Sequence, residues 1–169
     1  MSVLKVLQIP NPLLRNKTKS VQKVDNTIRK LMDDLKETCD FEEGAGLAAT
    51  QVGSSHSVIV VMCDNENPDM CYYMANPSIT WRSNEIINSE EGCLSVPGVR
   101  HTVKRNAEIK VSYLDYNNEL RTGHFKGKMS RCIQHEVDHL NGILYIDHLS
   151  PLKRNMVMKK YNKFVLNNK

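Results

Sequence analysis

The sequence lacks the features that mark membrane-spanning, exported and repetitive proteins. No apolar run is long enough to cross a bilayer, and neither a low-complexity tract nor an internal repeat occurs in the 169 residues. Lys5 and Pro10 interrupt the N-terminal stretch MSVLKVLQIPNPLLR, which excludes the apolar core of a signal peptide, and the stretch has too little Arg and Ser for a transit peptide. We therefore expect a cytoplasmic protein, or a mature form, with no membrane partner.

The sequence lacks the cysteine spacing of a disulfide or zinc framework. The five thiols are an odd number, they stand at scattered positions, and no CxxC pair occurs. We expect reduced thiols, at least one of which has a function. The five are Cys39, Cys63, Cys71, Cys93 and Cys132.

Acidic residues are missing from the C-terminal end. The last seventeen residues contain none, although the whole chain has a net charge of only +4. A charge this small does not by itself indicate nucleic-acid binding, and we expect no DNA partner. The basic end is either a solvated helix face or a docking tail for a polyanion. Its basic residues are Lys153, Arg154, Lys159, Lys160, Lys163 and Lys169.

The composition is that of an ordinary globular protein, with 40% hydrophobic and 25% charged residues. A chain of this length fits one domain, which we expect over 1–169. A helix should begin at the cap Asp25-Asn26, carry an apolar stripe over 28–39 and end before the glycine-rich loop GAGLAATQVG. Strand-like patterns follow, with turns at 65–69 and 117–118. The expected strands are 57–63, a segment around 71–74, 79–87, 107–114 and 119–125.

Two further helices are predicted near the C-terminus, which makes the fold class α+β. The first carries apolar residues at Ile133, Val137 and Leu140 and closes at Asn141-Gly142. The second, the basic helix of 150–169, opens at Ser150-Pro151, where Ser is a helix cap and Pro suits the first turn. We expect its apolar side to be formed by Leu152, Met156, Tyr161 and either Phe164 or Val165.

The stretch QHEVDHLNG has the spacing of a helical metal site. His135 and His139 are four residues apart, so both imidazoles face one side of a helix and can reach the same ion. Glu136 lies about one step round the helix, where a carboxylate can take a proton from water activated by the metal. A chance match on a polar helix face is the alternative, since HExxH is short.

A working site of this kind needs a third ligand, and the positions used by two protease groups do not supply it. Metzincin proteases have their third ligand, a histidine, where this chain has Tyr145. Gluzincin proteases use a glutamate further downstream, and no glutamate follows Glu136 in this chain. Asp147 and His148 are the remaining candidates downstream of Glu136, but they follow closely behind the loop and no helix periodicity would present their side chains to the metal. The ligand is therefore expected upstream, from the thiols or from His56, His101 and His124.

Cys93, in the stretch EEGCLSVPG, is the best candidate for this ligand. Gly92 lets the backbone come close to a bound group, and two imidazoles with one thiolate suit Zn²⁺ or Fe²⁺. A buried, inert thiol is the alternative for Cys93 taken alone. Cys132 lies three residues before His135, so spacing does not eliminate it, but we expect it to line the site or the core.

Three stretches in this order resemble the signature motifs of the type 1 peptide deformylases: GAGLAATQ, EGCLS and QHEVDH. The likeness extends to the early VLQIP, the helix before the first motif and the SPLK that starts the last helix, so it covers essentially the whole chain. It implies antiparallel sheets around a central HExxH helix, with an N-terminal and a C-terminal helix. It also implies an enzyme that removes the formyl group from the N-terminal formyl-methionine of new polypeptides and releases formate.

The resemblance assigns roles to single residues. The metal ligands would be Cys93, His135 and His139, and Glu136 would be the general acid and base. The Gln51 side-chain amide and the Leu94 backbone N–H would stabilise the oxyanion formed at the formyl carbon. One divalent metal per chain is implied, for which Fe²⁺ is common in the family and Zn²⁺, Ni²⁺ or Co²⁺ can substitute.

The resemblance also implies how the peptide and the ribosome would bind. The peptide would lie extended, hydrogen-bonded to backbone at Ala45, Gly46, Glu91 and Gly92. Its methionine side chain would enter a pocket bordered by Arg131 and Cys132, where the charged head of Arg131 can reach water while its stem lines the pocket. In some members the C-terminal helix docks near the ribosomal exit tunnel, and six basic residues suit contact with rRNA phosphate.

Two other function classes are compatible with parts of this pattern. A metalloendopeptidase is disfavoured by Tyr145 and by the missing downstream glutamate. A non-enzymatic, zinc-stabilised binding domain is disfavoured because structural zinc sites usually have four protein ligands. Three ligands beside a glutamate and an amide donor are more typical of an open catalytic site.

Overall fold

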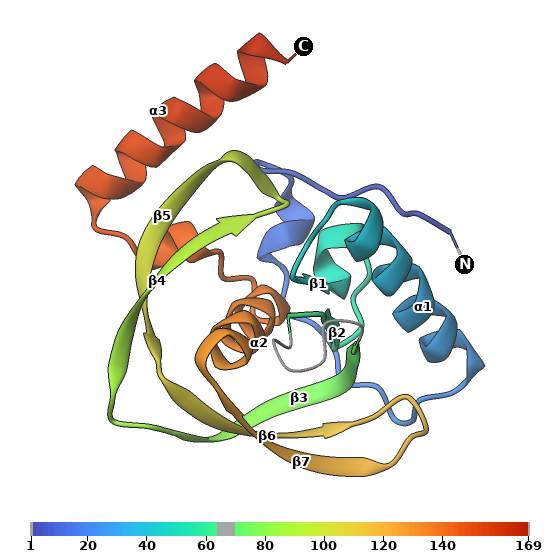
Figure 1. The fold of residues 1–169 in the computed structure, drawn as a ribbon. Coiled ribbons are helices and arrows are strands. Elements are labelled where there is room, and N and C mark those ends of the chain that lie inside the picture. The colour runs from blue at the N-terminus through green and yellow to red at the C-terminus, as the bar shows by residue number, and fades with distance from the viewer. Residues whose placement is uncertain (1, 64–69, 169) are drawn as a thin grey trace.

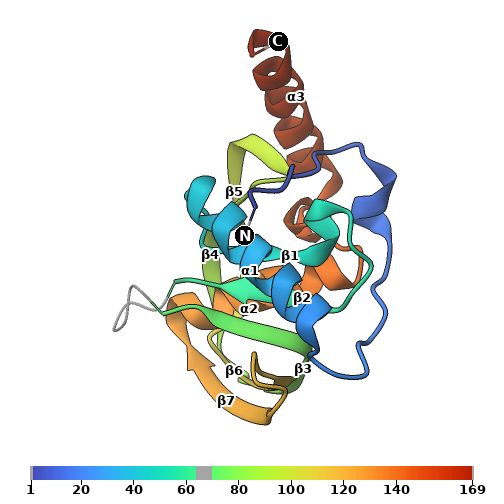
Figure 2. The same ribbon diagram turned by 90° about the vertical axis from the view of Figure 1, so that its right-hand side faces the viewer.

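The computed structural model describes residues 2–63 and 70–168, and in this part of the chain two antiparallel sheets curve around one helix, with further helices packed outside them (Figures 1 and 2). The turn predicted at 65–69 lies outside the described residues. The helices are η1 (Pro12–Arg15), α1 (Asn26–Phe41), η2 (Ala49–Val52), α2 (Gly127–Leu140), η3 (Tyr145–His148) and α3 (Pro151–Asn167), where η marks a 3₁₀ turn. The strands are β1 (Gly46–Ala48), β2 (Val58–Val61), β3 (Tyr72–Arg82), β4 (Ile86–Cys93), β5 (Val96–Asn106), β6 (Glu108–Leu114) and β7 (Leu120–Lys126).

Five strands form one sheet in the order β1-β2-β3-β6-β7, and β4 and β5 form a separate two-stranded ribbon. All neighbouring strands are antiparallel. Helix α2 lies inside the curve made by the sheet and the ribbon (Figure 1) and contacts strands from both. The expected α+β fold with a central HExxH helix is therefore confirmed.

The first helix forms where its cap and stripe predict it. The Asp25 carboxylate accepts hydrogen bonds from the backbone N–H groups of Thr27 and Ile28, which satisfies donors that the first turn leaves free. The apolar face of α1 is buried against β1 and β2, so packing rather than helix propensity holds it in place. Helix α2 ends as predicted: Gly142 follows it with a φ of 72°, a conformation that favours glycine.

The strand predictions are only partly right. The segments expected at 71–74 and 79–87 are mostly one strand, β3, which looks broken in sequence because two register shifts and Asn76, at a φ of 51°, interrupt the alternation. Strand β5 was not predicted, since its alternation is hidden behind Pro97-Gly98. The glycine loop contains the short strand β1, which exists because it pairs with β2.

The predicted apolar side of the last helix is wrong in two positions. Leu152 and Met156 are 72% and 53% exposed, whereas Val157 and Tyr161 are buried. Helix α3 extends away from the body in both views and packs mainly on β5 and η3, so only a narrow stripe is covered (Figures 1 and 2). The Tyr161 hydroxyl donates a hydrogen bond of 2.7 Å to the carbonyl of Ile9, which ties α3 to the N-terminal segment.

Candidate metal centre and active site

Helix α2 and the end of β4 bring three possible metal ligands together. His135 and His139 project from adjacent turns of α2, and Cys93 is the last residue of β4. The Cys93 Sγ lies 3.2 Å from the His139 Nε2, and one ligand atom from each of the three residues lies within 4.8 Å of the others. Of the described residues, these are the ones that form such a cluster, and Cys132 is not among them.

The two imidazoles are held by different surroundings. Burial lowers the pKa of His139 well below its usual value, so this ring is neutral and can offer a lone pair to a metal. Burial also acts to lower the pKa of His135, but hydrogen bonds to Cys93 and Glu91 outweigh it and raise that pKa. The Nδ1 of His135 lies 2.8 Å from the Glu91 Oε2. The other ring nitrogen, Nε2, is therefore the one that remains for the Cys93 thiol and a metal.

The donor set fits a divalent ion. Two imidazoles and one thiol converge on one point, and imidazole with thiolate ligands suits the later first-row metals. A carboxylate that orients a ligating histidine through its second nitrogen is a common support of metal sites. Three protein ligands leave a fourth position open, as in catalytic rather than structural sites.

The Glu91 carboxylate is part of a buried ion-pair network. Arg105 donates to both of its oxygens, at 2.8 and 2.9 Å, and to the Asp138 Oδ2 at 2.6 Å. Asp138 is also 2.7 Å from the His148 Nε2. Although burial opposes ionisation, the hydrogen bonds from Arg105 and His135 lower the pKa of Glu91 to about 2. A fixed anion therefore holds His135, and the sequence analysis missed Arg105, Asp138 and His148 as its support.

Ion pairs hold the side chains of three residues that the sequence analysis names. The resemblance implies that Glu91 offers its backbone to a peptide, and its side chain turns to Arg105 and His135, which leaves the backbone for that role. The sequence disfavours Asp147 and His148 as downstream ligands, and the structure gives both another partner. Asp147 instead forms an ion pair with Arg15, and His148 pairs with Asp138, so both hold the fold around α2.

Glu136 is a buried acid beside the three ligands. Its side chain is in the pocket wall, and its Oε2 has no hydrogen-bond partner among the described residues. Burial raises the pKa of Glu136 to about 7. Gly46 makes room for it, because a Cβ atom at residue 46 would stand 2.9 Å from the Glu136 Oε1. An acid with this pKa can both accept and release a proton near neutral pH.

Gln51 is fixed with its amide group toward the same point. The Gln51 Oε1 accepts a hydrogen bond of 2.9 Å from the Ala48 backbone, so the Nε2 points the other way. This Nε2 lies 3.2 Å from the Ser95 Oγ and 3.6 Å from the Cys93 Sγ. Ser95 was not singled out in the sequence; it occupies the turn between β4 and β5 and is fully buried.

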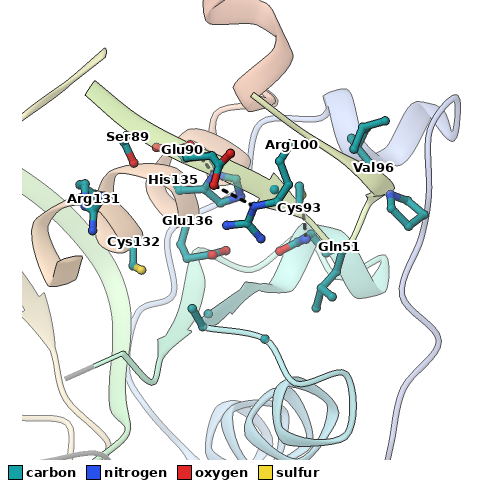
Figure 3. A pocket seen from close by; sticks show the side chains of 18 of the residues that line it. Gln51, Ser89, Glu90, Cys93, Val96, Arg100, Arg131, Cys132, His135 and Glu136 are labelled. Carbon is teal, nitrogen blue, oxygen red and sulfur yellow. Dashed lines mark hydrogen bonds and ion pairs between the residues drawn. The ribbon is translucent and has the colours of Figure 1, made fainter. Parts of the chain in front are cut away.

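These groups face a cavity of about 650 Å³ (Figure 3). One wall is the segment Glu43–Gly46, another is β4 with the β4–β5 turn, and α2 supplies the third. His139 lies beneath the lining and is fully buried. Every other residue expected at the site lines the cavity: Ala45, Gly46, Gln51, Glu91, Gly92, Cys93, Leu94, Arg131, Cys132, His135 and Glu136.

The chain matches the family model described as polypeptide deformylase over residues 3–155. A peptide deformylase from Phenylobacterium zucineum is 43% identical over 164 residues, which cover 96% of this chain and 97% of that protein. The solved peptide deformylase of Ehrlichia chaffeensis has a TM-score of 0.93 at 38% identity and covers 99% of both chains. A class I type b peptide deformylase from Acinetobacter baumannii, solved with Met-Ala-Ser bound, has a TM-score of 0.81 at 37% identity, over 88% of this chain and 100% of that one.

An open three-ligand metal site against a buried acid is the arrangement of a metal-dependent hydrolase. The family match and the full-length relatives define it further: the chain belongs to the peptide deformylase family. It removes the N-formyl group from nascent peptides, as the three motifs indicated. No helix in the described part of the chain is both long and apolar enough to cross a membrane.

Proposed function

We propose that Cys93, His135 and His139 hold one divalent ion and that Glu136 is the general acid and base of deformylation. The observation that carries this assignment is the convergence of the three ligand atoms beside a buried carboxylate without a partner. When bound, the ion supplies a Lewis acid that polarises the formyl group and lowers the pKa of water. Glu136 accepts a proton from the attacking water and delivers it to the leaving amine.

The negative charge that develops on the formyl oxygen is stabilised by two donors. The Gln51 amide is already oriented by its bond to Ala48, and Leu94 follows the metal-binding Cys93 in the tight turn that lines the cavity. Donors held in place before the reaction need no reorganisation, and one such donor is typically worth about 10²–10³-fold in kcat.

The peptide binds as an added strand between β4 and the Ala45-Gly46 segment. Four residues line the cavity and can offer backbone groups to an extended peptide bound there. Glu91 and Gly92 lie on one side of the peptide, and Ala45 and Gly46 lie on the other. Backbone pairing ignores sequence, which suits an enzyme that meets every new polypeptide. The Met-Ala-Ser bound to the Acinetobacter baumannii relative is a peptide of this kind.

The first side chain of the peptide, that of formyl-methionine, enters the end of the cavity beside Arg131 and Cys132. Both residues line the cavity from α2, one turn before His135 and Glu136 (Figure 3).

The native ion is proposed to be Fe²⁺, the ion that the resemblance implies. Zn²⁺, Ni²⁺ or Co²⁺ can substitute for it, because the mixed imidazole and thiolate set accepts all four metals. The chain acts as one domain over 1–169 in the cytoplasm.

The test is formate release from formyl-Met-Ala-Ser without oxygen, after loading the metal-free protein in parallel with Fe²⁺, Ni²⁺ and Zn²⁺. Cys93→Ala should lose the bound metal and the activity together. Glu136→Gln should keep one ion per chain and lose about 10²–10⁴-fold in kcat, because it removes proton transfer alone. Full turnover by Glu136→Gln would refute the assigned role, and no release with any metal would refute the assignment as a whole.

We further propose that α3 docks on the ribosome near the exit tunnel. Its described basic residues are all exposed, and the helix stands away from the body (Figure 2). A surface that carries positive charge without acidic residues suits contact with rRNA phosphate. Removing the helix is a poor test, since Val157 and Tyr161 belong to the core.

Charge reversal tests the docking without disturbing that core. Lys159→Glu combined with Lys163→Glu should weaken ribosome binding by about tenfold and leave turnover of small peptides unchanged. Lys17→Glu combined with Lys23→Glu is the matched control, because it changes the net charge equally at exposed positions elsewhere. Equal ribosome affinity of the two double variants would refute the docking proposal.

A further inference from the structure

Arg131 places a positive charge at the end of the cavity that takes the first side chain of the peptide. It lies four residues before His135 on α2, so both side chains leave the same face of the helix. In Figure 3 its side chain lies beside Ser89 and Cys132, on the α2 side of the cavity. Lys128, one turn earlier, also lines the cavity. This end is therefore more basic than a methionine side chain requires.

The Arg131 guanidinium has no partner in the described part of the chain. Among residues 2–63 and 70–168 it forms neither a hydrogen bond nor an ion pair, and its Nε is buried without an acceptor. Of the carboxylates that line the cavity, Glu90 is paired with Arg100 and Glu91 with Arg105. The other two, Glu43 and Glu136, form no ion pair with Arg131 among the residues that the structure describes. A buried donor without an acceptor is costly, and this cost is relieved when a ligand supplies an oxygen at that place.

Methionine itself supplies no such oxygen, because a thioether sulfur is a weak acceptor. Its oxidation product, methionine sulfoxide, has the same chain length and carries a strong acceptor oxygen on the sulfur. The remaining wall suits the rest of that side chain: the Cys132 thiol lies next to Arg131, and behind it the Cys63 thiol packs against Met129 at 3.5 Å. These soft, weakly polar groups accommodate methylene and methyl carbons.

We propose that Arg131 recognises a sulfoxide oxygen on the first residue, so that the enzyme deformylates peptides beginning with formyl-methionine sulfoxide as well as formyl-methionine. This inference rests on the proposed function of the cavity end as the site of the first side chain. The reaction is the same hydrolysis for both substrates: water adds to the formyl carbon, the C–N bond breaks, the amine gains a proton and formate leaves. The sulfoxide oxygen stays on its sulfur and no redox step occurs.

The experiment compares kcat/KM for formate release from formyl-Met-Ala-Ser and from each sulfoxide epimer of the same peptide. Both epimers are needed because oxidation makes the sulfur chiral and one guanidinium suits one configuration. The proteins are the metal-loaded wild type, Arg131→Met, Arg131→Lys and the control Arg82→Leu, an exposed arginine outside the cavity. The measured quantity is the ratio of sulfoxide to thioether turnover within each protein, so a general loss of activity cancels.

Wild type and Arg82→Leu should use the preferred epimer within about tenfold of formyl-Met-Ala-Ser, and Arg131→Met should lower this ratio by about a further tenfold. Arg131→Lys should fall between them, because lysine keeps the charge without the planar pair of donors. Competition by Met-Ala-Ser and by its sulfoxide gives the same comparison at the level of binding, independent of the rate of chemistry.

The possible failures can be told apart. An unchanged ratio in Arg131→Met overturns the inference, and so does a wild type that turns over formyl-Met-Ala-Ser but neither sulfoxide. In both cases the deformylase assignment stands. If Arg131→Met slows the two substrates equally, Arg131 contacts a group common to both, such as a peptide carbonyl, and the inference is again wrong. Loss of formyl-Met-Ala-Ser turnover in the loaded wild type would overturn both proposals.

Discussion

Gly46 and Glu136 face each other across the active site so closely that a side chain at residue 46 would collide with the carboxylate. A Cβ built on Gly46 lies 2.9 Å from the Glu136 Oε1 and 3.0 Å from its Cγ. It would also lie 3.0 Å from the Val60 carbonyl oxygen, so the backbone cannot simply yield. The short strand β1 thus limits the space around the Glu136 carboxylate, the proposed general base, and borders the proposed peptide groove.

Gly46→Ala should lower kcat by about 10–100-fold, because a displacement of the base by a fraction of an ångström is costly in a positioned proton transfer. The three metal ligands are on other elements, so the variant should still bind one ion per chain. Metal content by atomic spectroscopy and formate release measure the two properties. Wild-type turnover in a fully loaded Gly46→Ala protein would show that the carboxylate tolerates the contact.

Glu91→Gln should weaken metal binding without removing a ligand. Glu91 accepts from Arg105 and lies 2.8 Å from the His135 Nδ1, and loss of such a supporting carboxylate typically costs about 10–100-fold in metal affinity. Competition with a chelator measures the affinity.

The matched control is Glu90→Gln on the same strand. Its partner Arg100 is exposed, and the distance between them is 3.7 Å, so little should change. Equal metal affinities for Glu91→Gln and Glu90→Gln would mean that the orientation of His135 does not depend on Glu91.

Asp147→Asn should destabilise the protein at neutral pH by about 1–2 kcal/mol. Asp147 joins η1 and α3 to η3: it pairs with Arg15 and Arg154 and accepts a hydrogen bond from the Leu144 backbone. Burial acts to raise the pKa of Asp147, but the bond from Arg15 and the other partners outweigh it and lower that pKa below 3.8.

The pH dependence follows from this direction. Because the folded protein binds the Asp147 proton less tightly than the unfolded chain, the stabilising contribution is complete above about pH 4 and is lost as the pH falls through the lowered pKa. Urea unfolding of wild type and Asp147→Asn should therefore differ most at pH 6–7 and converge in strong acid. A difference that stays constant into acid would place the effect in packing rather than ionisation.

Gly98→Ala should loosen α3 from the β4–β5 ribbon. Gly98 has a φ of 74°, and a Cβ there would lie 2.2 Å from the Phe164 ring, so the variant adds both backbone strain and a clash. We expect a loss of about 1–3 kcal/mol in unfolding free energy.

A double-mutant cycle separates the two causes. In the Phe164→Ala background the clash is absent, so Gly98→Ala should cost only the backbone part, about 1 kcal/mol. If the cost is equal in both backgrounds, the ring moves aside freely and only the backbone conformation of Gly98 matters.

Local patterns in the sequence were sufficient for the elements whose contacts are close along the chain. Asp25 caps α1, and the stripe behind it is buried, because a helix repeats every three to four residues and that period is visible in the letters. Strand β5 and the continuity of β3 were not visible. Their alternation is interrupted by Pro97-Gly98 and by the bulges near Asn76, and only pairing with a neighbouring strand keeps those segments extended.

The sequence by itself determined that two of the proposed ligands and the proposed acid lie together, since His135, Glu136 and His139 lie within two turns of one helix. Tertiary structure decided the rest of the site. Cys93 reaches His139 across 46 residues only because the β4–β5 ribbon lies against α2, and the same ribbon brings Arg105 to Glu91. Local periodicity fixes which side chains share a helix face, whereas contacts between distant segments depend on how the sheets fold around the buried helix.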